Sequence, residues 1–134
     1  TGRYPIMRLI HTKGQVHQCG LSSPLVAGAS SGIGRHAAVH LADQGFTVLA
    51  GVRKQADAES LKEEGLSDLH PIILDVTKDE DIRSAVRQAQ SYGLPVVGLI
   101  NNAGVGYPMP VELVKMERVR DVFEVNVLSL VALV

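Results

Sequence analysis

Gly28-Ala29-Ser30-Ser31-Gly32-Ile33-Gly34 is the stretch that decides the fold of this chain. It lies between a short apolar run, Pro24 to Gly28, and a stretch from Gly32 to Gln44 whose apolar residues recur at helical spacing. A glycine turn between a strand and a helix is typical of phosphate-binding sites, because it permits a tight bend and lets the backbone approach a pyrophosphate. The N–H groups that begin the helix would then face the phosphates. A plain helix-start loop is the alternative, since a glycine turn alone is weakly specific.

Outward from this turn, strands and helices alternate along the sequence. Apolar and β-branched runs predict strands, and runs with apolar residues on one face predict helices. The predicted strands are Pro24 to Gly28, Phe46 to Val52, His70 to Val76 and Val96 to Asn101, and the predicted helices are Gly32 to Gln44, Gln55 to Glu64, Asp79 to Tyr92 and a last one from Glu117 onward. Apolar strands separated by helices predict an α/β fold, namely a Rossmann-type doubly wound parallel sheet represented by its first four strands and their helices.

The composition is that of one globular domain. The chain has 134 residues, of which 46% are hydrophobic and 20% charged, and its formal net charge is -1. This near-neutral charge gives no basic field for nucleic acid, and no apolar run is long enough to span a bilayer. The single cysteine, Cys19, has no internal disulfide partner, which favours a reducing compartment and predicts a cytoplasmic protein.

The two ends of the chain differ from the middle. Residues 1–23 show no clear period and predict a disordered leader in front of a domain of residues 24–134. Residues 127–134 are apolar and end without a helix stop signal, so we expect this domain to be truncated at its C-terminus.

Two groups of histidines could serve as metal ligands. His11 and His17 lie in the leader with Cys19, at a spacing that matches no usual zinc site. His36 and His40 lie four residues apart on one helix face without a third ligand, which favours surface or interface packing. We therefore predict no metal site.

Three further motifs follow the glycine turn in order. Asp75-Val76 closes the third predicted strand, Asn101-Asn102-Ala103-Gly104 closes the fourth, and Glu124-Val125-Asn126-Val127 lies in the last helix. With these motifs, residues 25–134 resemble the N-terminal portion of the short-chain dehydrogenase/reductase family. The resemblance implies an NAD(P)-dependent oxidoreductase that transfers hydride between a nicotinamide cofactor and an alcohol or carbonyl substrate. It also implies a homo-oligomer, because the last helix commonly packs against a second subunit in this family.

The resemblance further implies roles for the matched residues. Residues 28–34 would hold the pyrophosphate, Asp75 and Val76 would flank the adenine, and residues 102–104 would line the ribose region. Asn126 would be a catalytic residue that anchors a water in a proton relay, whereas Asn101 would tie strands together. The predicted cofactor-binding residues are Gly28, Ser30, Ser31, Gly32, Ile33, Gly34, Arg53, Asp75, Val76, Asn102, Ala103 and Gly104.

The chain departs from the family pattern in two respects. Ala27 stands where the family often has threonine, which removes a hydroxyl that could tie the turn to a neighbouring strand. More important, the catalytic serine and Tyr-x-x-x-Lys motif of the family have no counterpart, since none of Tyr4, Tyr92 and Tyr107 has a lysine four residues on. We therefore expect this chain to show no useful turnover by itself.

The end of the second predicted strand bears on the choice of cofactor. NAD sites usually place an acidic residue there to bind the ribose 2′-OH, but residues 45–55 contain none and include Arg53 and Lys54. An arginine there can form a forked contact with a 2′-phosphate, so NADP(H) is favoured. NAD(H) is the alternative, because Ser31 is not basic as in some NADP-using relatives, and an ordinary solvated charge pair is another interpretation of Arg53-Lys54.

Three functions stay open from the sequence. The first is the nucleotide-binding half of an oxidoreductase acting on steroid, retinoid or other hydrophobic alcohols, to whose branches residues 51–54 and 74–77 are similar. The second is a non-catalytic module that senses NAD(P) and binds a partner protein, and the third is a non-functional fragment of an incomplete gene. Tyr107 and Met109 follow the fourth strand, at the edge where ligands bind in such sheets, and would either approach substrate or pack as an ordinary loop.

Overall fold

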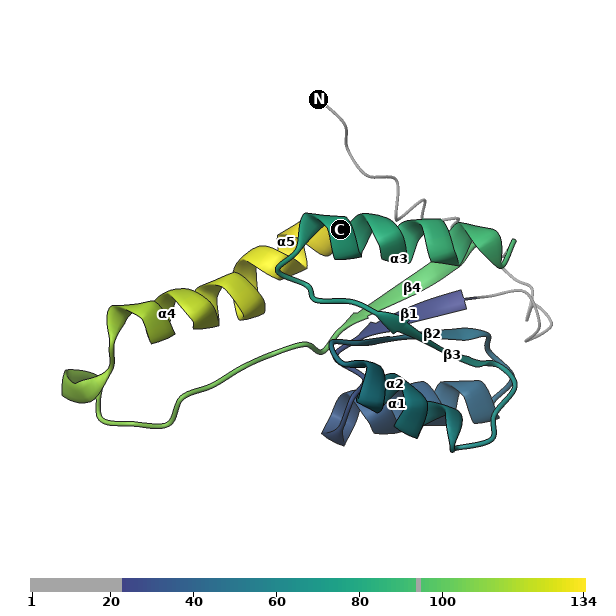
Figure 1. Ribbon diagram of the computed structural model, residues 1–134, viewed down its shortest axis with the longest axis horizontal. Helices are drawn as coiled ribbons and strands as arrows, with labels where there is room; N and C mark the ends of the chain where they lie inside the picture. The colour runs from purple at the N-terminus through teal and green to yellow at the C-terminus, as the bar shows by residue number, and fades with distance from the viewer. Residues whose placement is uncertain (1–22, 94) are drawn as a thin grey trace, which may run out of the picture.

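Four parallel strands form one sheet in the order β3-β2-β1-β4 in the computed structural model, which describes residues 23–93 and 95–134 (Figure 1). The strands are β1 (Ser23–Ala27), β2 (Val48–Val52), β3 (Leu69–Ile73) and β4 (Val96–Asn101). Leu25 pairs with Leu49 of β2 on one side and with Leu99 of β4 on the other, so β1 lies in the middle of the sheet. The predicted α/β fold with a parallel Rossmann-type sheet is confirmed.

The helices cover both faces of this sheet. They are α1 (Gly32–Asp43), α2 (Gln55–Lys62), α3 (Asp79–Ser91), the short 3-10 helix η1 (Val111–Leu113), α4 (Met116–Phe123), the π-helical turn η2 (Glu124–Leu128) and α5 (Ser129–Leu133). Figure 1 shows α1 and α2 on one face, α3 and α5 on the other, and α4 extending beyond the sheet. The chain therefore changes face after β3, and the next strand, β4, pairs with β1 rather than with β3.

Alternation along the strands produces two cores. Leu25 and Ala27 face a cluster that includes Ala85 of α3 and Leu133 of α5, whereas Val26 faces a cluster that includes Leu61 of α2. Each central strand is buried on both sides because side chains of a strand point alternately to its two faces. The sheet thus holds the carboxyl ends of β1 and β4 rigidly next to each other.

The first helix ends in a tight glycine motif, and this shortens the second strand relative to its prediction. Gly45 has φ 86°, its N–H donates to the Ala42 carbonyl, and the Phe46 N–H donates to the Leu41 carbonyl. These two bonds define a Schellman motif. Phe46 thus belongs to the helix end, and β2 begins two residues later than the sequence predicted, at Val48.

The end of β3 and the last helix also differ from prediction. β3 ends at Ile73, although the Leu74 N–H still donates to the Val52 carbonyl, because Asp75 then turns the chain by accepting the Thr77 N–H. The last helix is broken into α4, η2 and α5 rather than continuous from Glu117.

At the N-terminal side, Ser23 belongs to β1, although the sequence placed it in the leader. The rest of that leader, with His11, His17 and Cys19, lies outside the described residues. No helix in the described ranges has the length and apolar character needed to cross a membrane.

Candidate functional site

An open cavity of about 220 Å³ lies at the carboxyl edge of the sheet. Its lining comes from the segments that follow β1, β2, β3 and β4, so it lies where strand order reverses. In open α/β sheets, ligands bind at this point. The lining residues are Gly28, Ser30, Ser31, Val52, Arg53, Leu74, Asp75, Val76, Asn102, Ala103, Gly104, Val105 and Val125.

Gly28 brings the glycine turn against the segment that follows β4. Its φ is +79°, and a Cβ added to it would lie 2.7 Å from the Ala103 Cα, which is closer than real Cβ contacts allow. The N–H groups of Gly28 and Ala29 both donate to the Gly51 carbonyl, at 3.0 and 2.8 Å, which fixes the turn to β2. A side chain at position 28 would therefore force two backbone segments apart.

Asn102 closes the same contact from the other side. Its Nδ2 donates to the Gly28 carbonyl over 2.9 Å, and a Cβ added to Gly34 would collide with both that carbonyl oxygen and that Nδ2. The resemblance implied that Asn101 ties neighbouring strands together. In the structure it is the Asn102 amide that makes the hydrogen bond between the segments following β4 and β1. The Asn101 Oδ1 is buried and has no hydrogen-bond partner within the described residues.

The start of α1 presents free backbone donors. Ser31 is the N-cap residue, and its side chain makes no capping hydrogen bond. The Arg35 N–H is the first to bond within the helix, to the Ser31 carbonyl over 3.3 Å. The N–H groups of residues 32–34 therefore lack helical partners, as at any helix N-terminus, and they carry the positive end of the helix dipole. Ile33 is 82% exposed at this end and does not line the cavity, and neither do Gly32 and Gly34.

Arg53 and Asp75 both line the cavity, and they follow the neighbouring strands β2 and β3. Partial burial raises the pKa of the Asp75 carboxyl, but two hydrogen bonds from Thr77 and the charges of Lys78 and Arg53 outweigh this effect, so its pKa lies below the ordinary value of 3.8. The Asp75 N–H donates to the Asp81 carboxylate of α3 over 2.9 Å. Asp75 is therefore a fixed anion at neutral pH.

Asn126 lies in η2, beside the cavity rather than in its lining. Its Oδ1 accepts the Val105 N–H and its Nδ2 donates to the Val105 carbonyl, both over 2.9 Å. This pair of bonds ties η2 to the loop after β4. In the same loop, the Tyr107 ring packs under the Arg118 guanidinium of α4, with 4.5 Å from the guanidinium carbon to the ring centroid, and Met109 is exposed.

Four apolar lining residues were missed from the sequence. Val52 and Leu74 stand at the carboxyl ends of β2 and β3, and Val105 and Val125 adjoin predicted site residues. The Leu74 side chain packs closely over β2, since a Cβ added to Gly51 would lie 2.8 Å from its Cδ2. The histidine pair, His36 and His40, is exposed on α1 with its rings stacked 6.3 Å apart, away from the cavity lining.

Known proteins are similar to this chain in sequence and in fold. Residues 24–134 match the family profile described as short chain dehydrogenase. The chain is 41% identical over 112 residues to an uncharacterized oxidoreductase, YusZ, of Bacillus subtilis, covering 80% of this chain and 39% of that protein. It is 32% identical over 136 residues to 17-beta-hydroxysteroid dehydrogenase type 6 of Bos taurus, covering 97% of this chain and 42% of that protein.

A solved structure shares both the fold and part of the sequence. The crystal structure of a 3-ketoacyl-(acyl-carrier-protein) reductase from Brucella melitensis, complexed with NADH, aligns with a TM-score of 0.78 and 32% identity over 85% of this chain and 47% of that one. The chain thus spans less than half the length of these relatives. From the profile match over residues 24–134 and these relatives, the chain belongs to the short-chain dehydrogenase family.

Proposed function

We propose that this chain is the nucleotide-binding part of an oxidoreductase that transfers hydride between NADP(H) and an alcohol or carbonyl compound. The observation that carries the proposal is the contact among Gly28, Gly34 and Asn102, which leaves no space for side chains at either glycine. Such a close backbone approach next to the start of a helix is what a pyrophosphate site requires.

The residues present fit a dinucleotide. Unpartnered N–H groups begin α1, the Ser30 and Ser31 side chains line the cavity beside them, and the cavity extends from this turn past Arg53 to Asp75. Its volume of about 220 Å³ is below the roughly 300–1,000 Å³ of sites that enclose a drug-sized ligand, so it would hold only part of a dinucleotide. In this proposal the pyrophosphate lies at residues 28–34 and the adenine lies beside Asp75 and Val76.

The bound nicotinamide would supply the hydride chemistry. Asn102, Ala103 and Gly104 would hold the adjoining ribose, since they line the cavity next to the glycine turn. Asn126 as the anchor of a relay water stays a prediction from the family resemblance. In the structure one lone pair and one N–H of its amide are already used by Val105, so we propose that its first role is to position the loop after β4.

The substrate class is proposed from the relatives. One of them is named as a hydroxysteroid dehydrogenase and another as a reductase of ketoacyl groups, so a hydrophobic alcohol or ketone is the proposed substrate. Because no Tyr-x-x-x-Lys occurs in these 134 residues, we expect binding of cofactor without measurable turnover from this chain alone.

The test of the cofactor is a calorimetric titration of the chain with NADPH and with NADH, repeated for Arg53→Asp. Arg53 lines the cavity with an exposed side chain and is the donor we propose for the 2′-phosphate. We expect Arg53→Asp to weaken NADPH binding by about 10- to 100-fold, the range for losing a charged hydrogen-bonding partner, and to leave NADH binding unchanged or improved.

The matched control is Arg120→Asp, which makes the same charge change on α4, outside the cavity lining. It should leave both affinities unchanged. If the unsubstituted chain is folded and binds neither nucleotide, the proposed function is wrong. If it binds both but Arg53→Asp does not shift the preference toward NADH, the NADP(H) assignment is wrong.

A further inference from the structure

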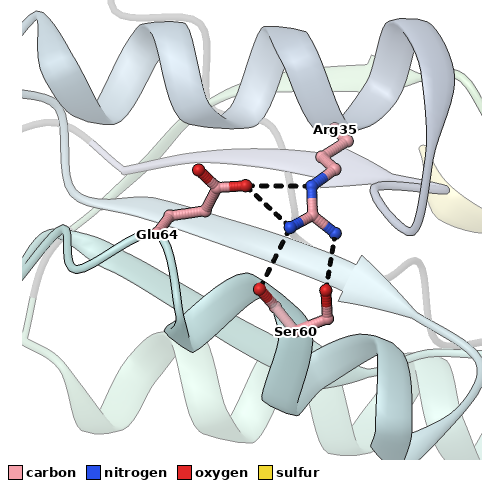
Figure 2. Close-up of polar contacts among 3 residues, drawn as sticks. All are labelled: Arg35, Ser60 and Glu64. Carbon is pink, nitrogen blue, oxygen red and sulfur yellow. Dashed lines mark hydrogen bonds and ion pairs between the residues drawn. The ribbon is translucent and has the colours of Figure 1, made fainter.

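Arg35 joins the first two helices by a forked contact (Figure 2). Its Nε and Nη2 donate to the Glu64 Oε1 over 3.0 and 2.7 Å. Its Nη1 donates to the Ser60 Oγ over 3.1 Å, and its Nη2 also donates to the Ser60 carbonyl over 3.0 Å. One guanidinium therefore binds a side chain, a backbone carbonyl and a carboxylate of the α2 segment at once.

The contact caps the C-terminal end of α2. The Glu64 N–H donates to the Leu61 carbonyl rather than to that of Ser60, so within the helix the Ser60 carbonyl is left without its usual partner. Arg35 supplies that partner and places a positive charge at the negative end of the helix dipole. The α2 helix buries Ala58 and Leu61 in the core cluster on this face of the sheet. The polar contact with Arg35 adds a directional constraint on where the C-terminal end of α2 lies.

Both helices that Arg35 connects begin at the cavity. Arg35 follows Gly34 directly and closes the first turn of α1, whose free N–H groups belong to the glycine turn. At the other helix, Arg53 lines the cavity and Lys54 is the N-cap residue of α2. Arg35 itself does not line the cavity, and each of its three guanidinium nitrogens donates to Ser60 or Glu64. It is thus placed to set the spacing between two ligand-binding turns without touching the ligand.

We propose that Arg35 is a positioning residue that fixes the distance between the glycine turn and the Arg53-Lys54 turn, and that it thereby controls selectivity for a 2′-phosphorylated nucleotide. The inference rests on the proposed function. A ligand that bears both a 5′- and a 2′-phosphate must contact both turns at once, so its affinity depends on their spacing. A ligand with the 5′-phosphate alone contacts the glycine turn and depends on the spacing much less.

The experiment measures the Kd values of 2′,5′-ADP and 5′-AMP by calorimetry for the full chain and for Arg35→Leu. The quantity of interest is the ratio of the two values. If Arg35 had only a general structural role, partial unfolding would weaken both ligands by the same factor and the ratio would not change. We expect the ratio to fall about tenfold toward 1 in Arg35→Leu, as when a supporting residue around a binding site is lost.

Two further variants sharpen the test. The charge exchange Arg35→Glu with Glu64→Arg keeps an ion pair between the same positions but loses the donors to Ser60, so it should recover part of the ratio. Arg87→Leu is the matched control, because it removes an arginine whose Nη2 lies 2.7 Å from the Glu80 Oε1 on α3, away from the cavity lining, and it should leave the ratio unchanged.

The outcomes separate the inference from the function it rests on. If the unsubstituted chain binds neither ligand, the proposed function fails and takes the inference with it. If the unsubstituted chain prefers 2′,5′-ADP but Arg35→Leu keeps the same ratio, or Arg87→Leu changes it equally, the inference about Arg35 is wrong and the proposed function stands.

Discussion

Gly34 is a position in the site that has no space for a side chain. A Cβ at this position would collide with the Gly28 carbonyl oxygen and with the Asn102 amide nitrogen, which are hydrogen-bonded to each other. We expect Gly34→Ala to lower the free energy of unfolding by about 2–3 kcal/mol, because the Gly28 carbonyl is backbone and cannot move aside as a flexible side chain can. Urea denaturation followed by circular dichroism measures this loss.

The matched control for Gly34 is Gly98→Ala in β4, where an added Cβ meets no atom within 4 Å. That substitution should change stability by about 0.5 kcal/mol or less, as for surface positions without special contacts. Equal losses in the two variants would show that the contact among Gly28, Gly34 and Asn102 does not restrict the residue at position 34.

Asp75 predicts how stability depends on pH. The pKa of its carboxyl is lower in the folded chain than the ordinary 3.8, so the carboxylate form stabilises the fold. This contribution is fully present above pH 3.8 and is lost as the pH falls below 3.8 through the lower folded value. We expect Asp75→Asn to remove it, so that the stability difference between the variant and the unsubstituted chain shrinks as the pH falls through this window.

The measurement is thermal unfolding at a series of pH values between about 6 and 2.5, a span that covers the ordinary carboxyl pKa values. Thr77→Val is a second variant, since it keeps the carboxylate but removes the hydroxyl that donates to it over 2.7 Å. It should reduce the acid-sensitive contribution without abolishing it. If the difference in stability between Asp75→Asn and the unsubstituted chain stays constant across the pH series, ionisation of Asp75 does not stabilise the fold.

Among the secondary-structure elements, η2 is one that its local sequence does not predict. The Val119, Val122 and Phe123 pattern indicates one continuous helix from Glu117, yet the structure has five residues of π-helix around Asn126. π-helical turns inside helices occur frequently at functional sites. Here the side chain of Asn126 bonds the backbone of Val105, twenty-one positions earlier, and that contact depends on where α4 lies relative to the loop.

We expect Asn126→Leu to release the loop after β4. Removal of both bonds to Val105 should raise the hydrogen-exchange rate of the Val105 amide by about tenfold or more, since one hydrogen bond contributes about 0.5–1.5 kcal/mol. Glu124→Gln is the control, because it alters an exposed side chain of the same turn. Unchanged exchange at Val105 in Asn126→Leu would mean that the loop is held by other contacts.

The remaining elements show what could be predicted and why. Apolar runs specify buried strands directly, so β4 was predicted with the bounds that the structure has, from Val96 to Asn101. The site residues named by motif also lie mostly in one cavity lining, because the carboxyl ends of parallel strands meet at one edge. Two contacts could not be predicted from the sequence: the hydrogen bond that Asn102, rather than Asn101, makes to Gly28, and the contact of Arg35 with α2. Both depend on how distant elements are rotated relative to each other.

At the scale of the whole molecule, α5 is what connects the protruding α4 to the body. Leu133 is 1% exposed and packs in the cluster formed by the sheet and α3, whereas Val131 is 75% exposed. We expect Leu133→Ala to cost about 2 kcal/mol, the low end for a buried leucine because a chain end can partly adjust. Val131→Ala should cost about 0.5 kcal/mol or less.

Urea midpoints of the two variants test this difference, and similar midpoints would show that α5 is not docked.

Exposed apolar side chains accumulate nearby, at Phe123, Val127, Leu128 and Val131. A surface of this kind is typical of an interface. The homo-oligomer that the family resemblance implies stays a prediction.

The contact between Asn102 and Gly28 also has a consequence for synthesis. The two residues are 74 positions apart, so a chain growing on the ribosome contains the whole glycine turn long before it contains the amide that locks it. Closure across such a span waits for the pairing of distant strands, which is slow compared with forming a helix. A nascent chain should therefore gain affinity for dinucleotide only after position 102 has left the exit tunnel, however well its first helix has already formed.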